Sequence, residues 1–192
     1  MTCKPTRYPN GLEVGCKLLV PPSTATYNGW ADYRDTATEV TPITIAPDTW
    51  TSLTCNDVGS ITQFLPLGSD DEQVAQLWDS SANQIDISEL QIGQIVSVRS
   101  DFRLYPSQNN AQVDFRLLFE TSGSVFLFDL QKRLARLDEG ADTPAAGNDI
   151  YKLVESIEFF ISPSLPLDAN ISVQVQCSVS SEAEVNGFFI RV

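Results

Sequence analysis

Acidic side chains in two loop-like stretches are the first candidates for chemistry in this sequence. Two carboxylates that flank a sugar could hydrolyse a glycosidic bond, and oxygen-rich loops can bind calcium. Neither stretch has the spacing of an EF-hand, and both are rich in Gly, Ser or Ala. We therefore interpret them mainly as solvated surface, with a calcium site and a carboxylate pair as the less favoured alternatives. The residues are Asp70, Asp71, Glu72, Asp138, Glu139 and Asp142.

Nucleophiles and metal ligands are scarce in the chain. It has no histidine, which excludes the Ser-His-Asp triad and the Cys-His pair, and it has no glycine-rich phosphate-binding motif. The cysteines, Cys3, Cys16, Cys55 and Cys177, lack CxxC spacing, so a zinc site would need all four. We predict no enzymatic activity, no metal and no cofactor. Cys177 is expected in the core, and a Cys3–Cys16 disulfide remains open, although the cytosol would keep both thiols reduced.

Aromatic side chains could form a platform on which sugar rings stack. Most of them fall at strand positions, where packing in a hydrophobic core explains them equally well. The sequence does not decide between the two interpretations. The residues are Trp30, Tyr33, Trp50, Trp78, Phe102, Tyr105, Phe126 and Phe128.

Composition limits the partners of this chain. Its 192 residues carry a net charge of −13, which argues against nucleic acid and against an anionic membrane surface. A hydrophobic fraction of 42% is that of a globular protein, no apolar run is long enough to span a bilayer, and the first residues lack the apolar region of a signal peptide. The acidic surface is interpreted as a source of solubility or as a docking face for a basic partner.

Alternating apolar and polar residues indicate the elements that must position any site. Ile171, Val173, Val175, Cys177 and Val179 alternate with polar residues, which is typical of a strand with one buried face. Similar patterns or β-rich runs cover residues 40–45, 49–53, 96–104, 113–120, 125–130, 151–161 and 185–192. Helix is expected only as a turn at 86–90 and, weakly, at 70–78. We predict an all-β fold, an antiparallel β-sandwich of jelly-roll type.

Two segments contain more apolar residues than a strand with one buried face requires. In the run 125–130, Phe126 and Phe128 lie on one face and Val125 and Leu127 on the other. Such a strand is either central in a sandwich or buried in a subunit contact. The terminal run contains Phe188 and Phe189 and has no polar tail. We expect a homotrimer in which Phe126, Phe128, Phe188 and Phe189 contribute to the interface.

The first 39 residues differ from the rest, and we predict a domain boundary between an extended arm, 1–39, and a jelly-roll domain, 40–192. The first segment is dense in proline and turn residues, yet it also carries apolar and basic side chains. It is either an irregular first strand packed on its own domain or an arm that lies on a neighbouring subunit. The arm interpretation makes interface residues of Leu12, Val14, Leu18, Leu19, Trp30 and Tyr33.

Short motifs along the chain resemble, in their order, those of small β-sandwich structural proteins of tailed bacteriophages, including capsid decoration proteins and fibre-head modules. The resemblance covers about residues 40–192, and the segment around Tyr8–Gly11 resembles the arms of such proteins. It implies a trimeric jelly roll bound to a virion and transfers no catalytic residue. The motifs are Thr49–Thr51, Asn56–Ser60, Leu65–Gly68, Leu77–Asp79, Asn83–Leu90, Ile92–Asp101, Arg136–Gly140 and Val185–Val192.

The resemblance implies a virion structural protein. The leading hypothesis is a capsid decoration, or cement, protein on the outer surface of a phage particle, made in the host cytoplasm. Its expected partners are further copies of itself and the major capsid protein or other virion proteins, with no nucleic acid and no membrane. The alternative is a receptor- or carbohydrate-binding head module of a tail fibre.

Overall fold

The computed structural model describes residues 6–7, 13–14, 27–137 and 151–192, and every regular element in these ranges is a β-strand. Short strands dominate the first half of the chain and long strands the second half. The strands are β1 Thr6–Arg7, β2 Glu13–Val14, β3 Trp30–Arg34, β4 Ile43–Ile45, β5 Thr51–Ser52, β6 Trp78–Asp79, β7 Gln84–Ile85, β8 Ile95–Pro106, β9 Ala111–Glu120, β10 Phe126–Leu137, β11 Tyr151–Phe160, β12 Asn170–Cys177 and β13 Ser181–Arg191.

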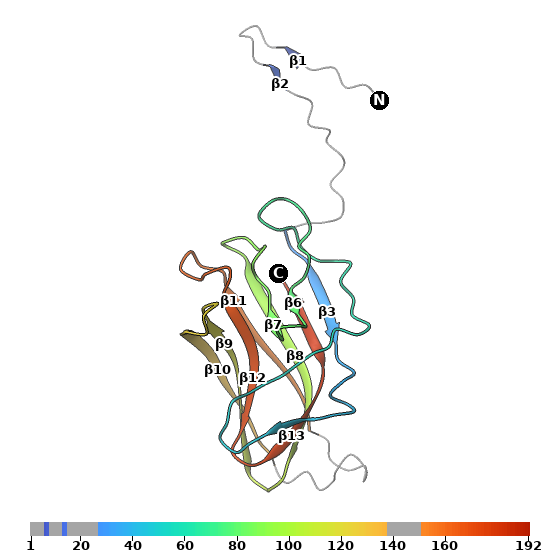
Figure 1. The fold of residues 1–192 in the computed structure, drawn as a ribbon, viewed down its shortest axis with the longest axis vertical. Coiled ribbons are helices and arrows are strands. Elements are labelled where there is room, and N and C mark those ends of the chain that lie inside the picture. The colour runs from blue at the N-terminus through green and yellow to red at the C-terminus, as the bar shows by residue number, and fades with distance from the viewer. Residues whose placement is uncertain (1–5, 8–12, 15–26, 138–150) are drawn as a thin grey trace.

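Two antiparallel sheets form a sandwich (Figure 1). One sheet has the order β10-β9-β12-β7-β6, with β5 also paired to β12; the other has the order β11-β8-β13-β3, with β4 also paired to β13. Strands β1 and β2 pair with each other. The predicted all-β fold, an antiparallel β-sandwich of jelly-roll type, is confirmed.

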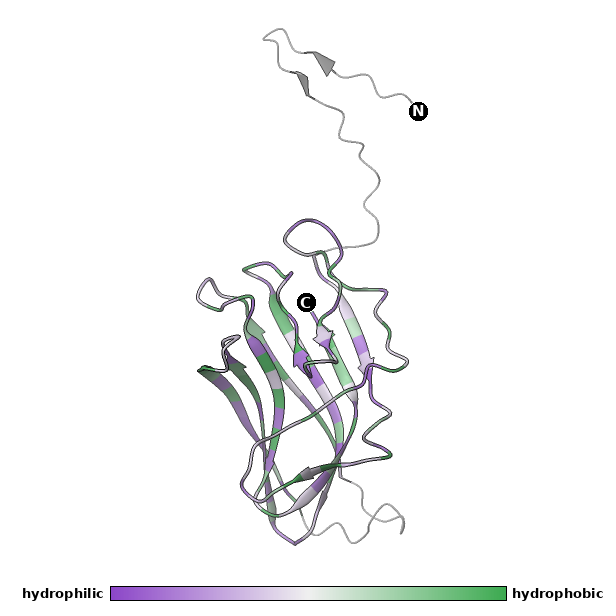
Figure 2. Ribbon diagram, in the orientation of Figure 1, coloured by the Kyte–Doolittle hydropathy of each residue, from purple (hydrophilic) through white to green (hydrophobic). Residues whose placement is uncertain are grey.

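The core lies between the sheets, where the inward residues of both meet. Ile171, Val173, Val175 and Cys177 are completely buried, as the alternation predicted. Aromatic pairs join the sheets: the ring centroids of Phe102 and Phe115 are 6.1 Å apart, and those of Trp78 and Phe188 are 4.5 Å apart. Figure 2 shows the resulting alternation of hydrophobic and hydrophilic residues along the strands. The period-two pattern therefore fixes which side chains face the core.

No helix forms over residues 70–78, and the weak expectation of one is wrong. The carboxylates there favour tight turns, because Asp and Asn side chains bond to nearby backbone amides in competition with helical hydrogen bonds. Asp70 accepts a hydrogen bond from the Glu72 amide at 3.0 Å. Residues 86–90 contain one turn, as expected. The Leu90 amide donates a hydrogen bond to the Ile87 carbonyl at 3.0 Å.

The sandwich begins earlier than the predicted boundary at residue 39. Strand β3 pairs with β13 over Trp30–Arg34, and Gly29 and Val192 exchange two backbone hydrogen bonds of 3.1 and 2.9 Å. Tyr33 is completely buried, and its phenol oxygen accepts a hydrogen bond from the Leu77 amide at 2.7 Å. Residues 27–39 therefore belong to the domain. Trp30 and Tyr33 lie on β3, the first strand of the sandwich, so the interpretation of these two residues as part of an arm is wrong.

Strand β10 is an edge strand, which corrects the expectation that it could be central. Its apolar run borders solvent on one side, with Phe126 and Phe128 both exposed. Phe128 still stacks on the core residue Phe119, with ring centroids 4.2 Å apart. At the other apolar segment, Phe188 is completely buried in the chain's own core, and only Phe189 faces outward. Phe188 is therefore a core residue, and its place in a subunit interface is not supported.

Candidate functional site

The acidic loop at residues 70–72 serves the backbone of its own turn. The Gly68 amide donates to the Glu72 carbonyl at 2.7 Å, and the Tyr27 hydroxyl donates to the Asp71 carboxylate. That bond is the main cause of the raised pKa of Tyr27. Within the described ranges no three Asp, Glu or Cys side chains gather as metal ligands. The second acidic stretch, Asp138, Glu139 and Asp142, lies outside the described residues.

Removal of divalent ions should leave the stability unchanged. The acidic loop at 70–72 is held by hydrogen bonds within the protein, so an excess of EDTA should not shift the melting temperature beyond measurement error. Differential scanning fluorimetry with and without EDTA checks this. A fall in melting temperature that calcium restores would contradict it and would identify an acidic loop as a cation site.

The two described thiols are core groups. Cys177 is completely buried, as predicted, and Cys55 is buried and free. Burial raises the pKa of the Cys55 thiol to about 12, so the nucleophilic thiolate is not formed at neutral pH. Cys3 and Cys16, with their possible disulfide, lie outside the described residues.

Core packing, one of the two interpretations of the aromatic residues, holds for three of the eight. Tyr33, Trp78 and Phe102 are completely buried. Trp50 covers the guanidinium of Arg116, whose central carbon lies 4.2 Å from the ring centroid. Among the predicted interface residues, Leu12, Leu18 and Leu19 lie outside the described residues, and Val14 pairs with Thr6 between β2 and β1.

The outer side of the five-stranded sheet brings together most of the ion pairs among the described residues, and we call it the charged face. The strand registers place its residues in rows that cross β11, β8, β13 and β3, with Ser156, Arg99, Phe189 and Asp32 forming one such row. No local pattern in the sequence indicates this face, because its members come from strands far apart in the chain. It consists of Lys152, Val154, Ser156, Glu158, Phe160, Ile95, Ser97, Arg99, Asp101, Arg103, Tyr105, Glu182, Glu184, Phe189, Arg191, Trp30, Asp32 and Arg34.

A buried carboxylate anchors one end of the charged face. The Glu184 side chain is only 7% exposed, and Arg103 lies 3.2 Å from it. The Tyr105 hydroxyl donates a second hydrogen bond to Glu184 at 2.9 Å. Burial, followed by this contact with the carboxylate, raises the pKa of Tyr105. The three side chains thus form a charge-assisted network that holds its geometry before any partner arrives.

Aromatic rings line the middle of the charged face. The Arg99 guanidinium lies over the ring of Phe189 at 5.1 Å and pairs with Asp101 at 3.2 Å. Phe189 stacks on Trp30 at 5.5 Å, and Trp30 stacks on Phe64 at 4.8 Å. The arrangement presents a guanidinium and three rings side by side, which are groups that protein interfaces favour.

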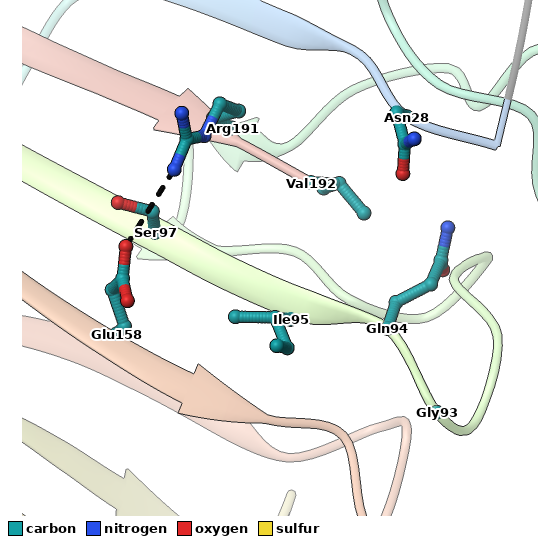
Figure 3. A pocket seen from close by; sticks show the side chains of 8 residues that line it. All are labelled: Asn28, Gly93, Gln94, Ile95, Ser97, Glu158, Arg191 and Val192. Carbon is teal, nitrogen blue, oxygen red and sulfur yellow. Dashed lines mark ion pairs between the residues drawn. The ribbon is translucent and has the colours of Figure 1, made fainter.

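A hollow of about 590 Å³ lies at the other end of the charged face (Figure 3). Arg191 and Glu158 form an ion pair of 3.6 Å that passes over Ser97 on the central strand. The side chains offer donors, acceptors and some apolar surface, and the carboxylate among them, Glu158, is paired with Arg191. The hollow therefore offers groups that can hydrogen-bond to a ligand or to a protein side chain. The hollow is lined by Asn28, Gly93, Gln94, Ile95, Ser97, Glu158, Arg191 and Val192.

Comparisons with known proteins add information on the fold alone. No family model matches the sequence, and no curated protein matches it. Among solved structures the fold is similar to that of the Eiger TNF from S. frugiperda, at 8% sequence identity and a TM-score of 0.41, over 85% of this chain and 90% of that one. The described part of the chain contains no helix with the length and hydropathy needed to cross a bilayer.

Proposed function

We propose that this chain is a structural protein of a tailed-phage virion, namely a capsid decoration protein that binds and stabilises neighbouring capsid subunits. The order of its sequence motifs, which resembles that of such proteins, suggests the virion. The observation that supports a binding role is the charged face, where ion pairs and aromatic rings are preorganised side by side. Its function would be mechanical and would come from the area of its contacts.

The proposal includes assembly into a homotrimer, with the major capsid protein as the second partner. Exposed apolar side chains lie on β11, which is an edge strand of the five-stranded sheet. Open edges of this kind promote unlimited association unless a partner covers them. Closed cyclic symmetry would cover such surface and leave no exposed copy of it.

Capsids that lack the protein provide the direct test. Purified protein should co-sediment with them at a fixed saturating ratio and should raise the temperature at which they break open. Binding of this kind supports a cement function because it links partner binding to particle stability. Absence of saturable binding to capsids would contradict the proposal.

Removal of residues 1–26 should separate binding from folding. The sandwich contains β3, so a variant that begins at Tyr27 keeps every strand of the two sheets. We expect it to fold with nearly unchanged stability and to bind capsids at least tenfold more weakly, because the apolar and basic side chains of the first segment would be lost. Circular dichroism and co-sedimentation measure the two effects, with the full-length chain as control. Normal binding would show that this segment is not an anchor.

The second candidate is a receptor- or carbohydrate-binding head module of a tail fibre. The hollow of about 590 Å³ favours it, since its volume and its polar lining suit a sugar unit. A glycan array with the purified protein tests this candidate. Binding of a defined glycan that is lost in Arg191→Ala, together with no binding to capsids, would replace the first proposal by the second.

A further inference from the structure

Charge is distributed unevenly over the molecule. The chain as a whole has a net charge of −13, whereas basic and acidic side chains balance on the charged face. Four ion pairs lie there, at distances of 3.2 to 3.6 Å. They are Arg34–Asp32, Arg99–Asp101, Arg103–Glu184 and Arg191–Glu158. The charged face is therefore nearly neutral, although it belongs to a strongly acidic protein.

Apolar side chains interrupt the charges on the same face. Val154 and Phe160 on β11 are 60% and 53% exposed, and Ile95 on β8 is 58% exposed. Ile95 and Phe160 are register partners, so they form one continuous apolar patch. The outer side of an antiparallel sheet that faces water is normally polar. Exposed apolar groups among preformed ion pairs indicate a surface that a protein covers.

Polar atoms on the central strand of this face lack partners. Arg99 Nε, Asp101 Oδ1 and Arg103 Nε are shielded from solvent and make no hydrogen bond within the described chain. Almost all buried polar atoms in folded proteins are hydrogen-bonded, so three exceptions on alternate residues of one strand need an explanation. Small rotations of these side chains against a second protein surface would supply the missing partners.

We propose that the charged face is the surface through which copies of this chain associate, so that its occupant is a second copy of the chain. Two copies of the chain, each with a net charge of −13, repel one another at long range. The electrostatic repulsion between them is smallest where the facing surfaces are neutral. Balanced charges of both signs also allow Arg and Asp or Glu to pair between copies. A basic partner would instead be drawn to the acidic loops elsewhere.

The hollow fits this arrangement because it continues the charged face. Ile95, Ser97, Glu158 and Arg191 belong both to its lining and to the charged face. A side chain that projects from a neighbouring copy can enter it and be enclosed by apolar and polar groups together. This inference rests on the homotrimer in the proposed function, and it identifies the sheet that forms the contact.

Val154→Glu tests the inference, with Val125→Glu as the matched control. Val125 is 62% exposed, almost the same as Val154, and lies just before β10, away from the charged face. Both changes add one negative charge, so a difference in oligomer dissociation between the two variants reflects where the charge is placed. We expect the unchanged protein and Val125→Glu to sediment as oligomers at micromolar concentration. Val154→Glu should dissociate at least tenfold more readily, towards the 21.1 kDa monomer, with an unchanged circular dichroism spectrum.

Other outcomes would overturn the inference in distinct ways. If Val154→Glu sediments like the unchanged protein, or if Val125→Glu is the variant that dissociates, the contact lies elsewhere. If the unchanged protein is a monomer that binds capsids and Val154→Glu abolishes that binding, the occupant is the capsid. Phe160→Glu serves as the second variant should Val154→Glu not fold. Capsid binding is measured separately, so failure of this inference leaves the decoration function intact.

Discussion

Val173→Asp should prevent the sandwich from folding. The Val173 side chain is completely buried between the sheets, and its carbonyl accepts a hydrogen bond from the Leu53 amide at 2.8 Å. Its register partner on β9 is Leu117, which is also completely buried. A carboxylate at this position meets no cation, and burial of an unpaired charge costs several kcal/mol. That is a large part of the about 5–15 kcal/mol by which native domains are stable.

Gln174→Asp is the matched control, because it introduces the same group one residue further along the strand. Gln174 points to the outer side of the sheet, where Arg116 Nε donates to its side-chain oxygen at 2.9 Å. A carboxylate there has a cation nearby, so we expect a loss of less than about 1 kcal/mol. Soluble yield and urea unfolding compare the two variants. Equal solubility and equal unfolding midpoints would mean that the assignment of the two faces is wrong.

The long strands could be predicted because their alternation is a local property of the sequence. In β12, each inward residue is apolar and each outward residue is polar, so the chain specifies its buried face without reference to the rest of the fold. Strand β8 follows the same rule over Val96, Val98, Phe102 and Leu104, all of which are completely buried, although Ser100, also completely buried, is a polar residue at an inward position. Period-two patterning therefore predicts strands, their faces and the sandwich class.

Strand β3 could not be assigned to the domain from its own residues. Trp30–Arg34 stands among turn-forming residues, and its partner β13 lies more than 150 positions away. The side chain of Tyr33 is buried because of that pairing, and nothing local in the sequence reports it. The edge position of β10 is likewise a property of the sheet order, so an apolar run on both faces was open to two interpretations.

The charged face could not be predicted from the sequence for the same reason. Glu184 and Arg103 are 81 residues apart, and only the register of β13 against β8 brings them within 3.2 Å. A regular strand from Ser181 to Arg191 would also predict the wrong faces, because the register shifts between Val185 and Gly187. The shift places Phe188 in the core and Phe189 on the charged face.

Gly187→Ala should strongly destabilise the protein. Gly187 lies at the register shift of β13, opposite Arg34 of β3, and its φ is +155°. A β-carbon there would lie 2.0 Å from the Tyr33 carbonyl oxygen, which is backbone and cannot rotate away. Strand β3 would have to move off the sheet. We expect the free energy of unfolding to fall by about 3 kcal/mol or more, from overpacking and from the strained φ together.

Substitutions at two other glycines separate the effect of overpacking from the effect of the strained φ on the stability of Gly187→Ala. Gly93 has a φ of +103° with no atom within 4 Å of an added β-carbon, so Gly93→Ala should cost about 1 kcal/mol through the backbone alone. Gly123 has neither constraint, since its nearest neighbour is Thr121 Oγ1 at 3.7 Å, and Gly123→Ala should be close to neutral. Urea unfolding of the three variants should therefore rank them Gly187→Ala, Gly93→Ala, Gly123→Ala in order of decreasing loss. If Gly187→Ala is no less stable than Gly93→Ala, then β3 does not pair with β13 as described. Strand β3 would then not be part of the sheet that carries the charged face.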